Sequence, residues 1–165
     1  MSSEAVFSRV TNIAERIREL IGETAHSLDA ALYRLNNPQL AEALRQSAAH
    51  GTRVRLILDR EKYETDAATR ALVAESGLRC RLLRGRAEPE SKMHHKFAIL
   101  DDRTVLTGSY NWTMESQENN FENLLILRDS LRALGYKKEF EALWERAAAE
   151  HDCDPSPGRS PRRPH

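Results

Sequence analysis

The sequence has few cysteines, no net charge and no long apolar run. Its two cysteines, Cys80 and Cys153, lie far apart in the chain. Because Cys153 falls in a polar tail where a disulfide would hold little structure, we expect a reducing compartment. Lysine plus arginine equals aspartate plus glutamate, at 25 residues each, which excludes a global basic field that attracts polyanions. Any polyanion must therefore meet a local patch.

Apolar runs are too short for a membrane protein. None approaches the roughly 20 residues that a membrane helix needs. Charges interrupt the N-terminal "MSSEAVFSRVTNIAERIREL", unlike the apolar core of a signal peptide. We therefore expect a cytoplasmic protein without stable membrane insertion. At 165 residues, the chain is long enough for one domain with a sizeable core.

The apolar pattern of the first third predicts an α/β fold. Residues 13–21 have helical spacing, residues 27–35 read as a buried strand, residues 39–49 as a helix and residues 53–59 as a second strand. A strand, a helix and a strand with short connections indicate a βαβ unit, in which the two strands are parallel.

The rest of the chain continues the alternation. We expect a helix at 67–76, a strand at 78–84, a loop at 85–92, a hairpin formed by "KFAILD" and "TVLTGS", a strand at "NLLILRD" and a long helix at about 130–151. This predicts a single domain over residues 1–151. Residues 152–165 have the Pro, Ser and Arg content of a disordered tail. The chain contains no internal repeat.

The first hairpin strand, "MHHKFAIL", carries three basic side chains. Because side chains alternate across a strand, His94 and Lys96 share one face, and His95 shares the other face with Phe97. The two histidines therefore cannot act on one atom. We expect His95 to be a core or supporting residue.

The second hairpin strand brings Gly108, Ser109 and Asn111 toward the same end as His94 and Lys96. An imidazole, an ammonium, a hydroxyl and a carboxamide, with a glycine that lets a ligand approach the backbone, suit an anionic tetrahedral centre. Lys96 offers a point charge for a phosphoryl oxygen, and Ser109 and Asn111 offer neutral donors. Neutral His94 has a lone pair that can attack phosphorus. In-line displacement then requires an acid on the opposite wall of the site, beyond the reach of His95.

The spacing of these residues forms a recognisable signature. It reads HxK, four residues, Asp, and a GSxN element seven residues later, at His94, Lys96, Asp101, Gly108, Ser109 and Asn111. This set resembles the signature of the phospholipase D superfamily, and the resemblance covers roughly residues 27–128. It implies a phospholipase D-like sandwich, with a mixed β-sheet flanked by helices on both faces.

The resemblance also implies how the site is completed. Members of the superfamily use two copies of the signature, with one histidine as nucleophile and the other as acid and then base, whereas this chain has one copy. A homodimer with a shared site is therefore implied, as is a metal-independent phosphodiesterase that forms a phosphohistidine without a cofactor. The single-copy relatives are bacterial phospholipase-D-type endonucleases and mitochondrial cardiolipin hydrolases of the Zucchini kind. "MHHKFAILD", "TGSYNWT" and "NNFENLLIL" resemble the latter most.

Two carboxylates have supporting roles in this interpretation. Glu122 matches a glutamate that orients a catalytic histidine in the relatives, which fixes an imidazole tautomer. By alternation, Asp101 points away from His94 and Lys96 at the hairpin turn, so we expect it to support the site structurally.

Other residues leave alternatives open. In "LRCRLLRGR", Arg79 and Arg81, with the later Arg84 and Arg86, could follow a phosphate backbone or could form a solvated strand edge. Trp112 could stack on a base or belong to the core. We expect no metal site, because adjacent histidines on a strand diverge and no Cys or Asp at ligand spacing completes a tetrahedral set.

The substrate class is the least determined part of the sequence interpretation. The leading substrate is nucleic acid, as single-stranded DNA or RNA or duplex DNA, because a soluble single-copy member resembles the endonucleases. The alternative is a phospholipase that acts on a lipid such as cardiolipin. A third interpretation is a catalytically silent module that holds a phosphate in the cleft.

Overall fold

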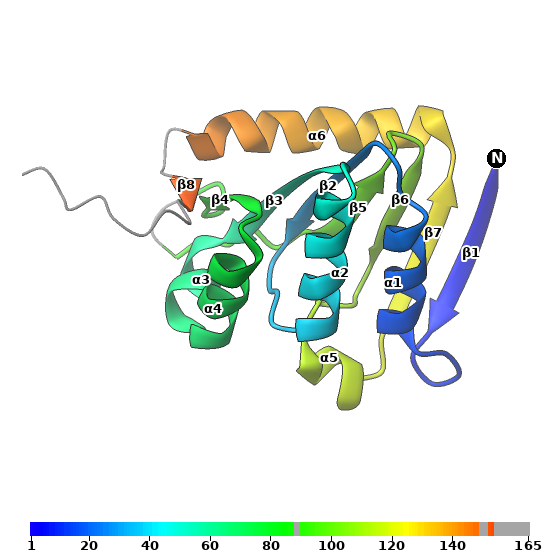
Figure 1. The fold of residues 1–165 in the computed structure, drawn as a ribbon, viewed down its shortest axis with the longest axis horizontal. Helices are drawn as coiled ribbons and strands as arrows, with labels where there is room; N and C mark the ends of the chain where they lie inside the picture. The colour runs from blue at the N-terminus through cyan, green and yellow to red at the C-terminus, as the bar shows by residue number, and fades with distance from the viewer. Residues whose placement is uncertain (88–89, 149–151, 154–165) are drawn as a thin grey trace, which may run out of the picture.

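A single mixed sheet forms the centre of the computed structural model, which describes residues 1–87, 90–148 and 152–153. Its strands lie in the order β1-β7-β6-β5-β2-β3-β4-β8 (Figure 1). The strands are β1 (Ser2–Phe7), β2 (Ser27–Leu32), β3 (Arg53–Asp59), β4 (Arg79–Leu83), β5 (Lys96–Leu100), β6 (Thr104–Gly108), β7 (Asn123–Arg128) and β8 (Asp152–Cys153). The helices are α1 (Ile13–Gly22), α2 (Pro38–Ala49), α3 (Arg60–Thr65), α4 (Ala67–Ser76), α5 (Met114–Glu118) and α6 (Ser130–Ala148).

The predicted βαβ unit is confirmed. β2 and β3 are parallel neighbours, with Leu28 opposite Val54, and α2 connects them. The helix begins at a well-formed cap, because the side-chain oxygen of Asn37 accepts a hydrogen bond from the backbone N–H of Gln39 at 3.0 Å and Pro38 occupies the first turn. Both strands are buried almost throughout, as expected for parallel strands covered on both faces.

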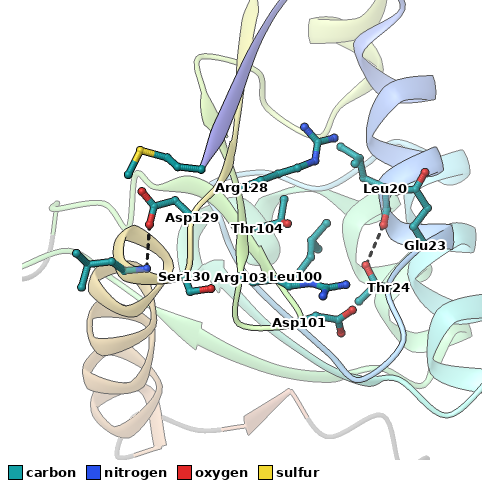
Figure 2. Close-up of a pocket in the computed structure, with 12 residues that line it drawn as sticks. Leu20, Glu23, Thr24, Leu100, Asp101, Arg103, Thr104, Arg128, Asp129 and Ser130 are labelled. Carbon is teal, nitrogen blue, oxygen red and sulfur yellow. Dashed lines mark hydrogen bonds between the residues drawn. The ribbon is translucent and has the colours of Figure 1, made fainter.

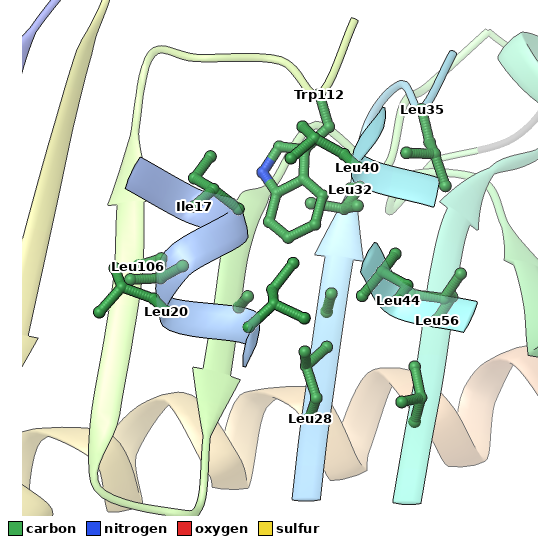
Figure 3. Packing of buried hydrophobic residues seen from close by; sticks show 14 of the residues in the cluster. Ile17, Leu20, Leu28, Leu32, Leu35, Leu40, Leu44, Leu56, Leu106 and Trp112 are labelled. Atoms are coloured by element: carbon green, nitrogen blue, oxygen red, sulfur yellow. The ribbon is translucent and has the colours of Figure 1, made fainter. Parts of the chain in front are cut away.

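Two apolar clusters cover the two faces of the sheet. One packs α1 and α2 against β2, β3 and β6, through Ile17, Leu40, Leu44, Leu56 and Leu106 among others (Figure 3). The other packs α6 against the opposite face, where Phe140 and Trp144 of the helix lie among Ile57, Phe97 and Val105 of the strands. The sandwich with helices on both faces is therefore confirmed.

Several short elements differ from the sequence-based expectations. β1 was not expected; it pairs antiparallel with β7 at the sheet edge, and Val6 is its buried residue. The short helices α3 and α5 were also not expected. β2 ends at Leu32 rather than at residue 35, and beyond it the backbone N–H of Tyr33 donates to the carbonyl of His95 at 2.7 Å.

The C-terminal boundary also differs. β8 pairs antiparallel with β4 and places Cys153 opposite Cys80, so the sheet extends past the boundary expected at residue 151. Cys153 therefore lies in a paired strand rather than in a polar tail. α6 is described to Ala148, and the remainder of the expected tail lies outside the described residues. Among the residues that the structure describes, no helix combines the length and apolar character needed to cross a bilayer.

The strand register brings distant segments to one edge of the sheet. β5 pairs antiparallel with both β2 and β6, with Lys96 opposite Leu32 and Phe97 opposite Thr107. The start of β5 therefore meets the carboxyl ends of β2, β3 and β6. This edge carries the signature residues other than Asp101, which lies at the opposite end of the hairpin.

Candidate active site

His94 and Lys96 lie together at the start of β5, against the ring of Tyr33. The imidazole and phenol centroids are 4.5 Å apart at an interplanar angle of 58°. Lys96 Nζ lies 5.3 Å from the centroid of the same phenol ring. It also donates a hydrogen bond to the carbonyl oxygen of His94 at 3.0 Å. Tyr33 is 8% exposed, so a nearly buried ring backs both basic groups.

Both basic groups have pKa values below their ordinary range. Desolvation by burial lowers the pKa of His94, and the positive charges of Lys96 and Lys92 lower it further. Burial also lowers the pKa of Lys96, against the opposing attraction of Glu122. A lowered pKa favours the uncharged imidazole of His94 near neutral pH, which leaves a nitrogen lone pair free to attack.

Ser109 and Glu122 form a hydrogen-bonded pair at the same edge. Ser109 Oγ donates to Glu122 Oε2, and Ser109 Oγ itself accepts from the backbone N–H of Asn123 at 3.0 Å. Asn120 Nδ2 donates to the other oxygen of Glu122 at 3.2 Å. Both carboxylate oxygens of Glu122 therefore have partners from its own chain, and its expected role in orienting a histidine stays a prediction.

Gly108 and Asn111 flank Ser109. A Cβ at Gly108 would lie 2.3 Å from the backbone oxygen of Asn123. The close packing of β6 against β7 is therefore sufficient to require glycine at this position, without any ligand. Asn111 Oδ1 is buried and lacks a hydrogen-bond partner among the described residues. Such a group is uncommon in a folded protein, and as an acceptor it could be satisfied only by a hydrogen-bond donor.

Asp101 lies at the far end of the hairpin, as its alternation predicts. Its carboxylate accepts hydrogen bonds from the backbone N–H groups of Ala25 at 3.1 Å, His26 at 2.7 Å and Ser27 at 3.0 Å. Burial opposes ionisation of Asp101, but these backbone donors outweigh it and lower the carboxyl pKa. Asp101 therefore ties the turn after α1 to the hairpin.

His95 lies on the opposite face from His94. Its Nε2 is 3.5 Å from Glu139 Oε1 on α6, and its ring centroid is 5.2 Å from that of Phe97. Its side chain is 47% exposed, so of the two expected roles the core role is excluded and the supporting role stays a prediction. Its separation from His94 agrees with strand alternation.

Trp112 belongs to the core and does not face a substrate. It is 2% exposed and packs with Ile17, Leu32 and Leu40 between α1 and α2 (Figure 3). Base stacking needs an accessible ring face, so of the two alternatives for Trp112 the structure supports the core and contradicts contact with substrate.

Arg79 and Arg81 also lie away from the site. The register sets Arg79 opposite Arg55 and Leu83 opposite Asp59, so β4 reaches the site edge only at its carboxyl end. The guanidinium of Arg81 lies 4.1 Å from the ring centroid of Trp144 on α6, and that of Arg79 lies 5.2 Å from it. Both arginines therefore pack against α6, and contact of either with a substrate stays a prediction.

The two later arginines of the same cluster do reach the site. A pocket of about 420 Å³ has His94 in its wall, together with the cationic residues Arg84, Arg86, Lys92 and Arg146, and it is also lined by His95 and Glu139 on the side of α6. Arg84 and Arg86 follow the end of β4, where the chain turns toward the signature. This defines a basic groove that leads to His94.

A second pocket lies away from the candidate catalytic residues. It has a volume of about 470 Å³ and includes Leu100, Asp101 and Thr104 in its lining (Figure 2). These residues lie at the hairpin end of β5 and β6, opposite the edge with His94 and Lys96. In the described part of the chain, no three His, Cys, Asp or Glu side chains are grouped to hold a metal ion.

Sequence reasoning missed two residues that position the site. Asp59, which is 1% exposed, accepts hydrogen bonds from the backbone N–H groups of Lys62 at 3.0 Å and Met93 at 2.9 Å. One buried carboxylate therefore joins α3 to the residue before His94. For Tyr33, the sequence pattern predicts only a place in the strand at 27–35 and not its contact with His94 and Lys96. Strand periodicity carries no signal for either contact, because both depend on pairing between distant segments.

The comparisons with known proteins define the family. Residues 17–144 match the family described as "Cardiolipin synthase, PLD-like domain". The human mitochondrial cardiolipin hydrolase is 35% identical over 133 residues, which are 81% of this chain and 51% of that protein. That of Xenopus laevis is 34% identical over 143 residues, 87% of this chain and 63% of that protein. The chain thus spans about half to two thirds of the length of these relatives.

Solved structures share the fold. Nuc, a phospholipase D family member from Salmonella typhimurium, superposes with a TM-score of 0.80 at 22% identity, covering 92% of this chain and 97% of that one. NucT from Helicobacter pylori gives a TM-score of 0.75 at 25% identity, covering 87% and 97% of the two chains. The chain belongs to the phospholipase D superfamily, in which it is a PLD-like domain with a single signature.

Proposed function

We propose that the protein is a metal-independent phosphodiesterase that forms a covalent phosphohistidine at a site shared by two subunits. One observation carries this proposal. His94, with a lowered pKa, lies beside Lys96 at the edge where Ser109 and Glu122 form their pair. A neutral nucleophile next to a cation and hydroxyl and amide groups suits attack on a phosphodiester.

In the first step, the imidazole lone pair of His94 forms a bond to phosphorus while the bond to the leaving oxygen breaks. Lys96 neutralises charge on the phosphoryl oxygens, the Nδ2 amide of Asn111 donates to them, and Ser109 donates to them when its hydroxyl hydrogen turns away from Glu122. In the second step, water attacks phosphorus and the bond to nitrogen breaks. The products are an alcohol and a phosphomonoester.

The proton for the leaving oxygen must come from the opposite side of phosphorus. His95 is excluded from this role because it lies on the other face, beside Glu139. We assign the role to the protonated imidazolium of His94 of the partner subunit, which gives its proton to the leaving oxygen and then, as the neutral imidazole, takes a proton from the attacking water. This assignment requires a homodimer in which the two site edges face each other.

Nucleic acid is our leading substrate class, and the basic groove favours it. Arg84, Arg86, Lys92 and Arg146 line the groove beside His94. Closely spaced cations beside a reacting histidine suit a polymer with regularly spaced phosphates. The chain as a whole is neutral, so this groove supplies the local patch that a polyanion needs.

A phospholipid such as cardiolipin is the second candidate. The curated relatives given above are named mitochondrial cardiolipin hydrolases. In addition, Phe7 and Phe121 are 53% and 85% exposed and line one pocket with Glu122. Exposed aromatic rings beside a site suit contact with acyl chains or with the interface of a membrane.

A substrate panel tests the proposal. Labelled single-stranded DNA, duplex DNA, single-stranded RNA and cardiolipin vesicles are incubated with the protein in EDTA, beside the His94→Asn variant. Polynucleotide cleavage that is lost in the variant supports the leading substrate. Lipid turnover alone selects the second candidate. Binding without turnover on every substrate would instead support a silent phosphate-binding module. The cytoplasmic location stays a prediction that cell fractionation tests.

A further inference from the structure

Lys62 on α3 shares the ring of Tyr33 with the two catalytic basic groups. Its Nζ lies 5.7 Å from the phenol centroid, whereas Lys96 Nζ lies 5.3 Å from it and the His94 imidazole centroid 4.5 Å. Two ammonium groups and the nucleophile therefore surround one aromatic side chain. The distance between the two ammonium groups therefore cannot exceed the sum of their distances to the centroid of the Tyr33 ring.

The position of Lys62 is fixed relative to His94 by a buried carboxylate. Asp59 Oδ1 accepts from the backbone N–H of Lys62 at 3.0 Å, and Asp59 Oδ2 accepts from that of Met93 at 2.9 Å. Met93 is 3% exposed and immediately precedes His94. The first turn of α3 and the start of the signature are therefore held as one unit, which preorganises the Lys62 backbone for a ligand at His94.

Nearby acids do not neutralise Lys62. Within the described ranges, no carboxylate lies at ion-pair distance from its ammonium. Glu64 faces Arg60 at 3.7 Å and Arg84 at 4.0 Å, and both oxygens of Asp59 accept backbone hydrogen bonds. The half-buried Lys62 thus carries its positive charge near the reacting group without a direct ion-pair partner in the described part of the chain.

From this arrangement we infer that Lys62 forms a second phosphate subsite, which selects substrates that carry another phosphodiester next to the scissile one. The inference rests on the proposed function and names a feature of its substrate. Lys96 provides the cation for the scissile phosphate, so the charge of Lys62 is available to the neighbouring phosphate. A polynucleotide and a lipid with two phosphates both supply this chemistry.

The test compares substrates that differ by one phosphodiester. The nucleotide arm uses a dinucleoside monophosphate and a trinucleoside diphosphate, and the lipid arm uses vesicles of phosphatidylglycerol and of cardiolipin. For wild type, kcat/KM is higher on the two-phosphate member of the arm that is cleaved. Lys62→Ala lowers this preference by about tenfold, because a charge-assisted contact is lost. Lys62→Arg retains most of the preference.

The matched control is Lys138→Ala, which removes an exposed lysine of α6. It leaves the preference as in wild type. An equal loss on one-phosphate and two-phosphate substrates would overturn the inference, because Lys62 would then act at the scissile phosphate or in folding. An unchanged preference in Lys62→Ala would overturn it equally.

Failure of the proposed function can be distinguished from failure of this inference. If wild type cleaves no substrate in either arm, the proposed function fails. Binding of the same four ligands to His94→Asn protein then decides the role of Lys62. Adding Lys62→Ala to the His94→Asn protein should lower the ratio of its affinities for the two-phosphate and one-phosphate ligands by about tenfold. An equal affinity for one-phosphate and two-phosphate ligands before that change would refute the subsite.

Discussion

The ammonium of Lys96 lies 3.0 Å from the carbonyl oxygen of His94 and 3.5 Å from its ring nitrogen Nδ1. The first contact is a good hydrogen bond, whereas the second is at the outer limit of one. Lys96 is therefore anchored to the backbone of the nucleophile and acts on its imidazole mainly through charge. The residue that neutralises substrate charge therefore also influences the protonation of the nucleophile two residues before it.

The pKa of His94 should depend on the cations around it. Lys92 is an exposed residue whose charge lowers that pKa. Lys92→Ala removes a repulsion from the imidazolium, so the pKa of His94 should rise toward its ordinary value. The acid limb of kcat/KM should then move to higher pH. NMR titration of the imidazole measures the first effect, and Lys138→Ala is the control. A pKa that stays or falls would contradict the assignment.

The two adjacent histidines should differ greatly in their contribution to activity. His94→Asn removes the nucleophile and should lower kcat by about 10³-fold or more. His95→Asn changes a half-exposed side chain on the other face and should cost less than about tenfold. Circular dichroism checks that both variants fold. The reverse ranking would show that the catalytic face is the one next to α6.

Local patterns in the sequence were sufficient for the hairpin. Alternation places His94 and His95 on opposite faces, and antiparallel pairing, with Phe97 opposite Thr107, brings the start of β5 to the end of β6, as the hairpin pattern predicts. The signature could therefore be located before any fold was known. The order of a buried strand, a helix and a second buried strand identified the parallel unit of β2 and β3.

Contacts between distant segments could not be predicted in this way. Tyr33 meets His94 only because β2 pairs with β5, and Asp59 meets Met93 only because β3 ends at the same edge. Residue type was also ambiguous, since Trp112 beside the signature suits a core as well as a stacking site. β1 escaped detection because Val6 is its one buried position.

Activity should survive chelation. The proposed steps use imidazole, ammonium, hydroxyl and amide groups of the protein, and none requires a metal-bound water. Turnover in EDTA should therefore stay within about twofold of turnover in buffer containing Mg²⁺, allowing for salt effects on a polyanionic substrate. Abolition by EDTA that added Mg²⁺ or Zn²⁺ restores would defeat the mechanism.

Trp112 should contribute to stability rather than to substrate binding. Trp112→Ala removes a buried indole between α1 and α2 and should lower the free energy of unfolding by about 3–5 kcal/mol. Urea denaturation measures this loss, and Arg79→Ala, at a position away from the site, provides a comparison for activity. A variant of undiminished stability whose KM rises would instead place Trp112 against the substrate.

A shared site makes activity depend on the composition of the dimer. Each proposed site needs His94 of one subunit and His94 of the partner subunit, so a mixed dimer with one His94→Asn chain has no complete site. Wild-type chains and chains of that variant are co-refolded in different ratios at one total chain concentration. The activity should then fall with the square of the wild-type fraction. A linear fall would mean that each chain carries an independent site. His95→Asn chains serve as the matched control and should cause little loss. Sedimentation must show dimers in every mixture, because a fully active monomer would refute the shared site directly.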